Sequence, residues 1–142
     1  MSQAALEKVR FFDADVGYEN LWAEKRDVDL YVIKSIPYFI YDISVEDVIR
    51  VAKEEADQTL CFSEVVTHSE HSTIRVRPKD FTLDQREGEE LLRKIESFGA
   101  VTETLPPRLV AVDIPSCGDV EPLTRFLTES HIPWEWADKA PC

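Results

Sequence analysis

The first half of the chain has the apolar and polar alternation of short β-strands. Its β-branched and aromatic residues fall in four clusters, residues 20–25, 30–33, 38–41 and 59–68. Clusters of this length, separated by polar turns such as "RDVD" and "KEEADQ", are typical of a small barrel or a strongly twisted antiparallel sheet. Residues 48–51 form either a further strand or part of a short helix capped by Ser44. Pro37 is expected at a strand end, a bulge or an edge, because proline donates no backbone hydrogen bond.

The second half alternates between the periods of strands and helices. In order, it predicts a strand over 72–78, a helix over 81–99, two strands around Pro106-Pro107, a helix over 116–130 and a strand over 132–138. Thr82 or Asp84 is the expected cap of the first helix, and Gly99 is its expected left-handed stop. Strand, helix, strand, strand, helix, strand is the order of a ferredoxin-like sandwich, with both helices on one face of a four-stranded sheet.

The predicted fold class is therefore α+β. A small, barrel-like antiparallel β unit at the N-terminus packs on a C-terminal ferredoxin-like βαββαβ sandwich. We predict a β-rich lobe over residues 1–68 and an α+β lobe over residues 69–142, with a single compact unit as the alternative. The N-terminal lobe is the natural cover for the sheet face that the helices leave open.

Charge narrows the class of partner. The chain has 28 Asp and Glu residues against 16 Lys and Arg residues, a formal net charge of −12. A surface this negative repels phosphate backbones, so nucleic acid is not an expected partner. The charge either keeps the protein dispersed or steers it onto a basic partner.

The sequence also bears on compartment and cofactors. The three cysteines, Cys61, Cys117 and Cys142, are widely spaced and give neither a disulfide framework nor a metal knuckle. The start lacks the pattern of a signal peptide, and the most apolar stretch, Tyr31–Ile43, is interrupted and too short to span a membrane. We expect a cytoplasmic protein with no membrane partner and no cofactor.

Several short motifs resemble those of the bacterial domain-of-unknown-function family DUF4265. They are "NLWAE" at 20–24, "IPYFIYDIS" at 36–44, "EDVIRV" at 46–51 and "HSTIRV" at 71–76. This sequence has Glu46 and Glu70 where the family pattern leads us to expect a small residue, so we expect the local backbone to differ there. The resemblance implies a soluble bacterial α+β protein, and it implies no established reaction.

Catalytic and metal chemistry is weakly represented. His68 and His71 fall on opposite faces of a strand, and His131 is expected at the other end of the sheet, so no metal site is predicted. His71 beside Ser72 lacks the elbow and oxyanion loop of a hydrolase. Cys117 lies at a helix start, where its thiol pKa would be lowered, but no base is within reach. We therefore predict that the protein is not an enzyme.

Two arginines suggest an alternative role. Arg75 and Arg77 alternate with Ile74 and Val76, so they point to the face of the strand away from the helices. They either pair with the acidic N-terminal lobe, which is the interpretation we favour, or hold an anionic ligand between the lobes. In the second case the predicted ligand-binding residues are His71, Thr73, Arg75 and Arg77.

The leading functional hypothesis is an acidic inhibitor of another protein, such as an immunity protein that occludes the active site of a cognate bacterial toxin. Aromatic residues would fill the centre of the interface and acids its rim. The predicted partner-binding residues are Tyr38, Tyr41, Asp42, Glu46, Asp47, Glu54, Glu55, Asp57, Trp134 and Trp136. A small-molecule-binding or regulatory module is the alternative.

Overall fold

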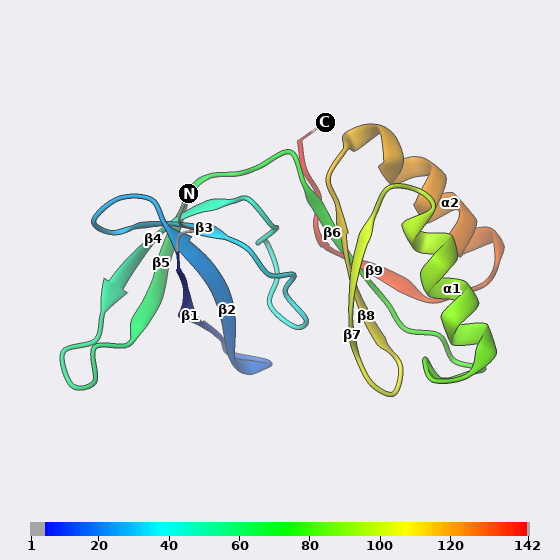
Figure 1. Cartoon of the computed structure of the whole chain (residues 1–142), viewed down its shortest axis with the longest axis horizontal. Coiled ribbons are helices and arrows are strands. Elements are labelled where there is room, and N and C mark those ends of the chain that lie inside the picture. The colour runs from blue at the N-terminus through cyan, green and yellow to red at the C-terminus, as the bar shows by residue number, and fades with distance from the viewer. Residues whose placement is uncertain (1–4, 142) are drawn as a thin grey trace.

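The computed structural model describes residues 5–141 as two lobes joined by a short linker (Figure 1). The first lobe is a closed barrel of five strands, β1 (Leu6–Asp13), β2 (Gly17–Lys25), β3 (Leu30–Ile33), β4 (Val48–Lys53) and β5 (Leu60–Thr67). Each strand pairs antiparallel with the next one along the chain. A short parallel pairing of β1 with β5, at Val9 and Leu60, closes the barrel.

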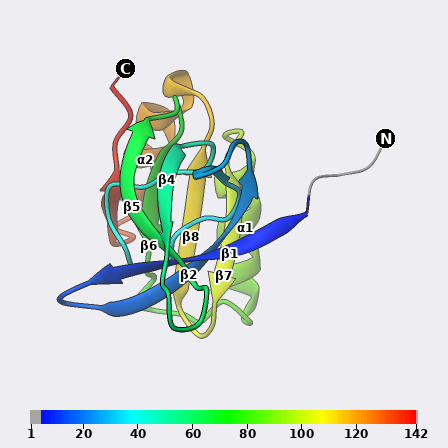
Figure 2. The same cartoon turned by 90° about the vertical axis from the view of Figure 1, so that its left-hand side faces the viewer.

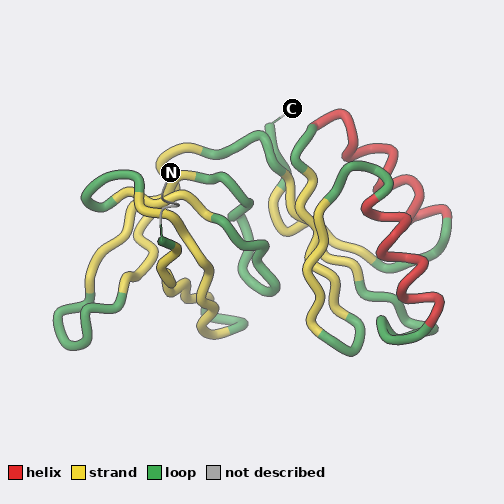
Figure 3. Tube along the Cα trace, in the orientation of Figure 1, coloured by secondary structure: helices red, strands yellow, loops and turns green. Residues whose placement is uncertain are grey.

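The second lobe is a four-stranded antiparallel sheet with two helices. Its elements are β6 (Ser72–Val76), α1 (Arg86–Glu96), β7 (Val101–Leu105), β8 (Leu109–Ile114), the short 3-10 helix η1 (Cys117–Asp119), α2 (Val120–Glu129) and β9 (Trp134–Asp138). The strand order is β7-β8-β6-β9. Both helices cover the sheet face that is turned away from the barrel (Figures 1 and 3). The predicted α+β class, with a small barrel beside an antiparallel sheet, is confirmed.

The barrel interior follows the two-residue period of its strands. Val9 and Phe11 of β1 are buried while Phe12 is exposed, and Leu21 and Ala23 of β2 are buried against them. β1 was not predicted, because the charged residues of "LEKVRF" leave only a weak apolar alternation. Without β1 the barrel would not close, so the sequence pattern alone understates this lobe.

The aromatic cluster at residues 38–41 is not a strand, so this part of the prediction is wrong. These residues belong to the loop between β3 and β4, whose backbone is interrupted by left-handed residues: φ is 68° at Asp42 and 71° at Glu46. Glu46 occupies a position where the family resemblance leads us to expect a small residue. Glu46 therefore adopts the left-handed backbone conformation that glycine adopts without strain.

The second core lies between the sheet and the helices. Ile74 and Val76 of β6 point toward the helices, where Ile95 of α1 and Leu123 and Leu127 of α2 are fully buried. The predicted strands and helices of this lobe are all present. In the barrel, residues 48–51 form part of strand β4 rather than a helix.

Helix α1 ends as expected and begins differently. Gly99 has the expected left-handed φ of 89° after the helix C-terminus. The N-cap residue is Gln85, whereas the sequence favours Thr82 or Asp84. The Gln85 side chain instead reaches back and accepts a hydrogen bond from the Thr82 backbone N–H at 3.0 Å.

Gly88, in the first turn of α1, gives a direct test of this packing. A Cβ at residue 88 would lie 2.5 Å from both the Leu83 Cα and the Thr82 carbonyl oxygen, which are backbone atoms that cannot rotate away. Alanine would favour an isolated helix by about 1 kcal/mol, but forced repacking costs about 1–3 kcal/mol. We expect Gly88→Ala to lower the free energy of unfolding measured by urea titration.

Gly118→Ala is the matched control, because a Cβ there meets only the Ser116 hydroxyl at 3.7 Å. Equal or greater stability of Gly88→Ala relative to the wild type would contradict the close approach of α1 to residues 82–83.

Candidate functional site

The lobes meet through the loop between β3 and β4, residues 34–47, which we call the junction loop. It extends from the barrel to the sheet face that the helices leave open (Figures 1 and 3). The Asp42 backbone N–H donates a hydrogen bond to the Ala137 carbonyl of β9 at 2.8 Å, and the Tyr38 hydroxyl donates to the Thr104 carbonyl of β7 at 3.1 Å. One loop thus contacts both outer strands of the sheet.

Glu19 of β2 holds the junction loop from the barrel side. Its carboxylate accepts hydrogen bonds from the consecutive backbone N–H groups of Tyr38, Phe39 and Ile40, at 2.7, 3.1 and 3.0 Å. Three convergent N–H donors form a concave site that favours a carboxylate. Glu19 therefore determines the path of the loop where it passes over the sheet.

Ser44 connects the junction loop to the sheet. Its hydroxyl donates to the Asp138 carboxylate at 2.7 Å and lies 2.7 Å from the Thr73 hydroxyl, which must then donate to it. Ser44 and Thr73 are fully buried. Burial raises the pKa of Asp138, the charge of Asp47 raises it further, and the hydrogen bond from Ser44 lowers it.

Arg75 lies at the centre of the open sheet face and is 4% exposed. Its guanidinium donates a hydrogen bond to the Ile40 carbonyl, lies 4.8 Å from the centre of the Tyr41 ring and is 3.8 Å from the Glu135 carboxylate. Burial lowers the pKa of Arg75, whereas the nearby tyrosine and carboxylates raise it. Within residues 5–141, its Nε is a buried polar atom with no hydrogen-bond partner.

The phenol of Tyr41 completes this group. Its hydroxyl donates to Glu135 at 3.0 Å, and this bond, followed by burial, raises the pKa of Tyr41. Glu103 of β7 lies on the same sheet face, where burial raises its pKa and a hydrogen bond from the Ile36 backbone opposes the shift. Carboxylates, a guanidinium and a phenol therefore lie together between the lobes, with Arg75 buried and Tyr41 45% exposed.

The four predicted ligand-binding residues do not form one site. His71 Nδ1 lies 2.8 Å from the Asp113 carboxylate of β8; burial raises the pKa of Asp113, and His71 lowers it. Thr73 faces Ser44. Of the four, only Arg75 and Arg77 line the same pocket. This pocket has a volume of about 370 Å³, and its other lining residues are Leu109, Pro133, Trp134 and Glu135. His71 and Thr73 do not line this pocket.

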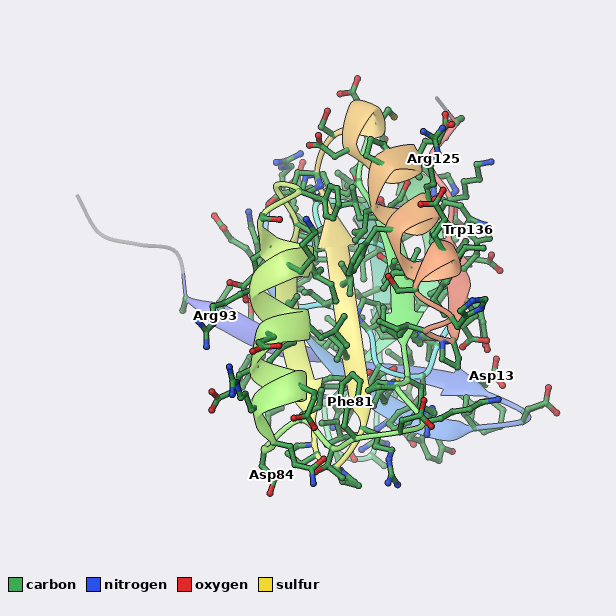
Figure 4. All side chains as sticks on the ribbon, turned by 90° about the vertical axis from the view of Figure 1, so that its right-hand side faces the viewer. Asp13, Phe81, Asp84, Arg93, Arg125 and Trp136 are labelled. Carbon is green, nitrogen blue, oxygen red and sulfur yellow. The ribbon has the colours of Figure 1, made fainter. Side chains whose placement is uncertain are left out.

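The predicted partner-binding residues are also dispersed. Asp47, one of the predicted partner-binding residues, is fully buried, so its carboxylate does not reach the surface where a protein partner would contact it. The ring centres of Trp134 and Trp136 lie 5.3 Å apart, and both side chains are partly buried against the core between the sheet and the helices. Figure 4 shows Trp136 beside α2. Glu54, Glu55 and Asp57 are exposed in the turn between β4 and β5, at the far end of the barrel (Figure 1).

The most exposed aromatic pair was missed. Phe12 and Tyr18, opposite each other on β1 and β2, are 65% and 71% exposed, with ring centres 5.1 Å apart. We call residues 12–18 the aromatic hairpin; it projects beyond the body of the molecule, with Asp13 near its end (Figures 2 and 4). Gly17, with φ of 94°, marks the turn, and "FFD" before it is the signal that would have located the hairpin.

The cysteine candidate has no thiolate to offer. Cys117 is in a disulfide bond, contrary to the expectation drawn from cysteine spacing, while Cys61 is free. His131 lies just before the first residue of β9. This strand is antiparallel to β6, with Trp134 opposite Val76 and Asp138 opposite Thr73, so His131 is at the end of the sheet away from the start of β6. No helix in residues 5–141 has the length and apolar character needed to cross a membrane.

Together the barrel, the sheet with its helices and the buried polar junction define a two-lobed α+β protein. The chain belongs to the family described as "Domain of unknown function (DUF4265)", whose model matches residues 19–136. The chain is similar over its whole length to a solved structure, "Novel crystal structure of a hypothetical protein from Neisseria gonorrhoeae", with a TM-score of 0.74 and 18% sequence identity, covering 100% of this chain and 99% of that chain. That likeness shows the fold. No curated protein matches the sequence.

Glu19→Gln tests how the junction loop is held. A glutamine presents one acceptor oxygen and two donor hydrogens, so at least one of the three backbone N–H groups loses its acceptor. Leaving a buried donor without a partner costs about 1–3 kcal/mol. We expect urea denaturation to show a loss of this size, against a change near zero for Glu24→Gln, which removes only a 3.9 Å surface ion pair with Lys34. Similar losses for the two variants would rule out this role for Glu19.

Proposed function

We propose that the protein is an acidic, protein-binding inhibitor that docks on a basic partner, as an immunity protein docks on a bacterial toxin. The observation that carries this proposal is the aromatic hairpin. Large apolar side chains that project into solvent need an explanation, since a monomeric protein normally buries them.

The surroundings of the hairpin favour a protein partner. Phe12 and Asp13 share a notch of about 170 Å³ with Tyr41 and Asp42 of the junction loop. Two of the predicted partner-binding residues therefore lie beside the hairpin. Protein–protein interfaces commonly have aromatic hot-spot residues at the centre and polar or charged residues at the rim. The hairpin and its neighbouring carboxylates have this composition.

The charge of the whole chain favours a basic partner. A net charge of −12 speeds encounter with a positive surface, and the steering weakens as salt increases. Asp13, Asp15 and Asp42 flank the exposed rings, and Glu54, Glu55 and Asp57 extend the negative surface at the other end of the barrel. A toxin whose active site binds a polyanion would present such a basic surface, and the inhibitor would act by occluding it in the cytoplasm.

We further propose that the C-terminal lobe is a ferredoxin-like sandwich. Numbered within this lobe, the order β7-β8-β6-β9 reads 2-3-1-4, and neighbouring strands are antiparallel. Two strand–helix–strand units whose helices share one face support this classification. The proposed domain boundary, at residues 68 and 69, falls in the linker between β5 and β6.

The proposal predicts that the hairpin carries the binding energy. Tagged full-length protein is used to capture partners from cells of its source organism, and the captured protein is purified and its affinity measured. We expect one stoichiometric basic protein whose association slows as NaCl increases. We expect the double variant Phe12→Ser/Tyr18→Ser to bind about thirtyfold or more weakly, since hot-spot truncations cost about 2 kcal/mol or more.

Val28→Ser/Val66→Ser is the matched control, because it removes two other exposed apolar side chains, 84% and 43% exposed, from different parts of the barrel. Absence of a stoichiometric partner, or equal binding by the two double variants, would refute the proposal.

A second candidate function rests on the pocket at Arg75 and Arg77. This pocket combines two guanidinium groups with an apolar wall made by Leu109, Pro133 and Trp134, and Arg75 Nε lacks a partner within residues 5–141. Sites that bind small molecules usually have mostly apolar walls with a small number of polar groups. The ligand would be a small carboxylate or phosphate, bound beside the junction loop.

Phosphate and citrate are suitable probes for this pocket. We expect a saturable rise in the melting temperature that is lost in Arg77→Ala and kept in Arg93→Ala, which removes an exposed arginine of α1. Arg77 is exposed, so its loss should leave the fold intact. An equal rise in both variants would identify a general salt effect and refute the pocket as an anion site.

A further inference from the structure

We propose that Asp47, His68 and Asp138 form a binding site for a divalent transition-metal ion, of the zinc class, at the junction of the two lobes. The three residues come from three separate segments: the end of the junction loop, the linker after β5 and the last position of β9. One ligand atom from each lies within 4.8 Å of the other two.

The distances between the candidate ligands suit a metal ion. Bonds of about 2.1 Å place the ligand atoms of a tetrahedral site about 3.4 Å apart. His68 Nδ1 lies 3.7 Å from Asp47 Oδ2, a separation too long for a hydrogen bond and close to this value. A small rotation of His68, whose side chain is 53% exposed, would bring the imidazole to bonding distance.

The carboxylates are already oriented by their neighbours. Asp47 accepts hydrogen bonds from the backbone N–H groups of Ser69, at 2.7 Å, and Ser44, at 3.0 Å. Asp138 accepts one from the Ser44 hydroxyl at 2.7 Å. In known metal sites, hydrogen bonds of this kind orient the side chains that ligate the metal and contribute to the metal affinity. Ser44 therefore positions both carboxylates.

The charge at this point calls for a cation. Asp47 is fully buried and Asp138 half-buried, and in residues 5–141 neither has a lysine or arginine within ion-pair distance. The imidazole of His68 is the nearest basic side chain to Asp47, with Nδ1 3.7 Å from Asp47 Oδ2. Two carboxylates held together away from water repel each other unless a positive charge lies between them. A divalent ion would supply that charge without protonation of either group.

The surroundings of His68 bear on how a metal ion would reach the site and on which metal ion the site would prefer. A hollow of about 520 Å³, lined by His68, Ser69, Glu70, Pro115, Ser116, Cys117 and Pro141, opens beside the imidazole and gives an ion a route from solvent. An imidazole nitrogen favours a first-row transition metal over Mg²⁺ or Ca²⁺, which prefer oxygen ligands alone. Three protein ligands leave a fourth position for water.

A metal ion here would connect the two lobes. Asp47 immediately precedes barrel strand β4, His68 immediately follows barrel strand β5, and Asp138 ends β9 of the sheet. The ion would add to the hydrogen bonds of Ser44 and would stabilise the docked arrangement over one in which the lobes separate. The aromatic hairpin and the arginine pocket take no part in this, so the inference is independent of the proposed function.

The test uses the purified full-length chain after chelator treatment. Zn²⁺ is titrated by calorimetry, with Mg²⁺ titrated in parallel, and the melting temperature is measured with and without each ion. We expect one Zn²⁺ per chain and a rise in melting temperature of about 5 °C or more at a hundredfold excess over Kd. His68→Ala should bind Zn²⁺ about tenfold or more weakly, because it removes one of three ligands.

Asp138→Asn and His131→Ala provide the second variant and the control. The amide of Asp138→Asn can still accept the Ser44 hydrogen bond but lacks the carboxylate charge, so we expect a loss like that of His68→Ala. His131 is exposed at the other end of β9, so His131→Ala should bind as the wild type does. No saturable Zn²⁺ binding, equal binding of Mg²⁺, or an equal loss in His131→Ala would overturn the site.

Discussion

The open face of the four-stranded sheet is the constraint on which the rest of the molecule depends. The helices bury one face with apolar side chains, but the other carries Thr73, Arg75 and Asp113, all buried. Buried polar groups must be hydrogen-bonded, and a buried arginine needs partners for its charge. The sheet alone provides only some of these, such as His71 for Asp113 and Glu135 for Arg75. The barrel, through its junction loop, provides carbonyl and hydroxyl partners for the others.

This requirement explains the irregular backbone of the junction loop. A regular strand along the sheet would present alternate side chains, whereas the sheet face needs the Ile40 carbonyl for Arg75 and the Ser44 hydroxyl for Thr73. The left-handed residue Asp42 lies between Ile40 and Ser44, and the second one, Glu46, follows Ser44. Such residues cost free energy where they are not glycine, and they persist when surrounding contacts determine them. Here Glu46 gains an ion pair with Lys34 at 2.7 Å.

Sequence reasoning succeeded where the pattern was local and failed where it was not. Helix α1 and strand β6 carry their own periodicity, and Gly99 its own stop signal, so the C-terminal lobe was predicted element by element. The segment 38–41 has strong β-propensity, but tertiary contacts with Glu19 and Arg75 override it. β1 has weak propensity and is a strand because β2 and β5 pair with it. The approach of Asp47, His68 and Asp138 depends on two lobes docking, which no spacing in the sequence encodes.

The residues of the buried junction and those of the exposed hairpin differ in how much they contribute to the stability of the fold. Tyr38 and Asp47, which in sequence resemble interface residues, are engaged in hydrogen bonds within the molecule: Tyr38 donates to the Thr104 carbonyl, and Asp47 accepts from the Ser69 backbone N–H. Phe12 and Tyr18 contact each other and project into solvent, so their removal should cost little folding free energy. Under the proposed function, substitutions in the hairpin would change the partner without disturbing the buried junction. The exposed hairpin can therefore vary in sequence at less cost in folding free energy than the buried junction.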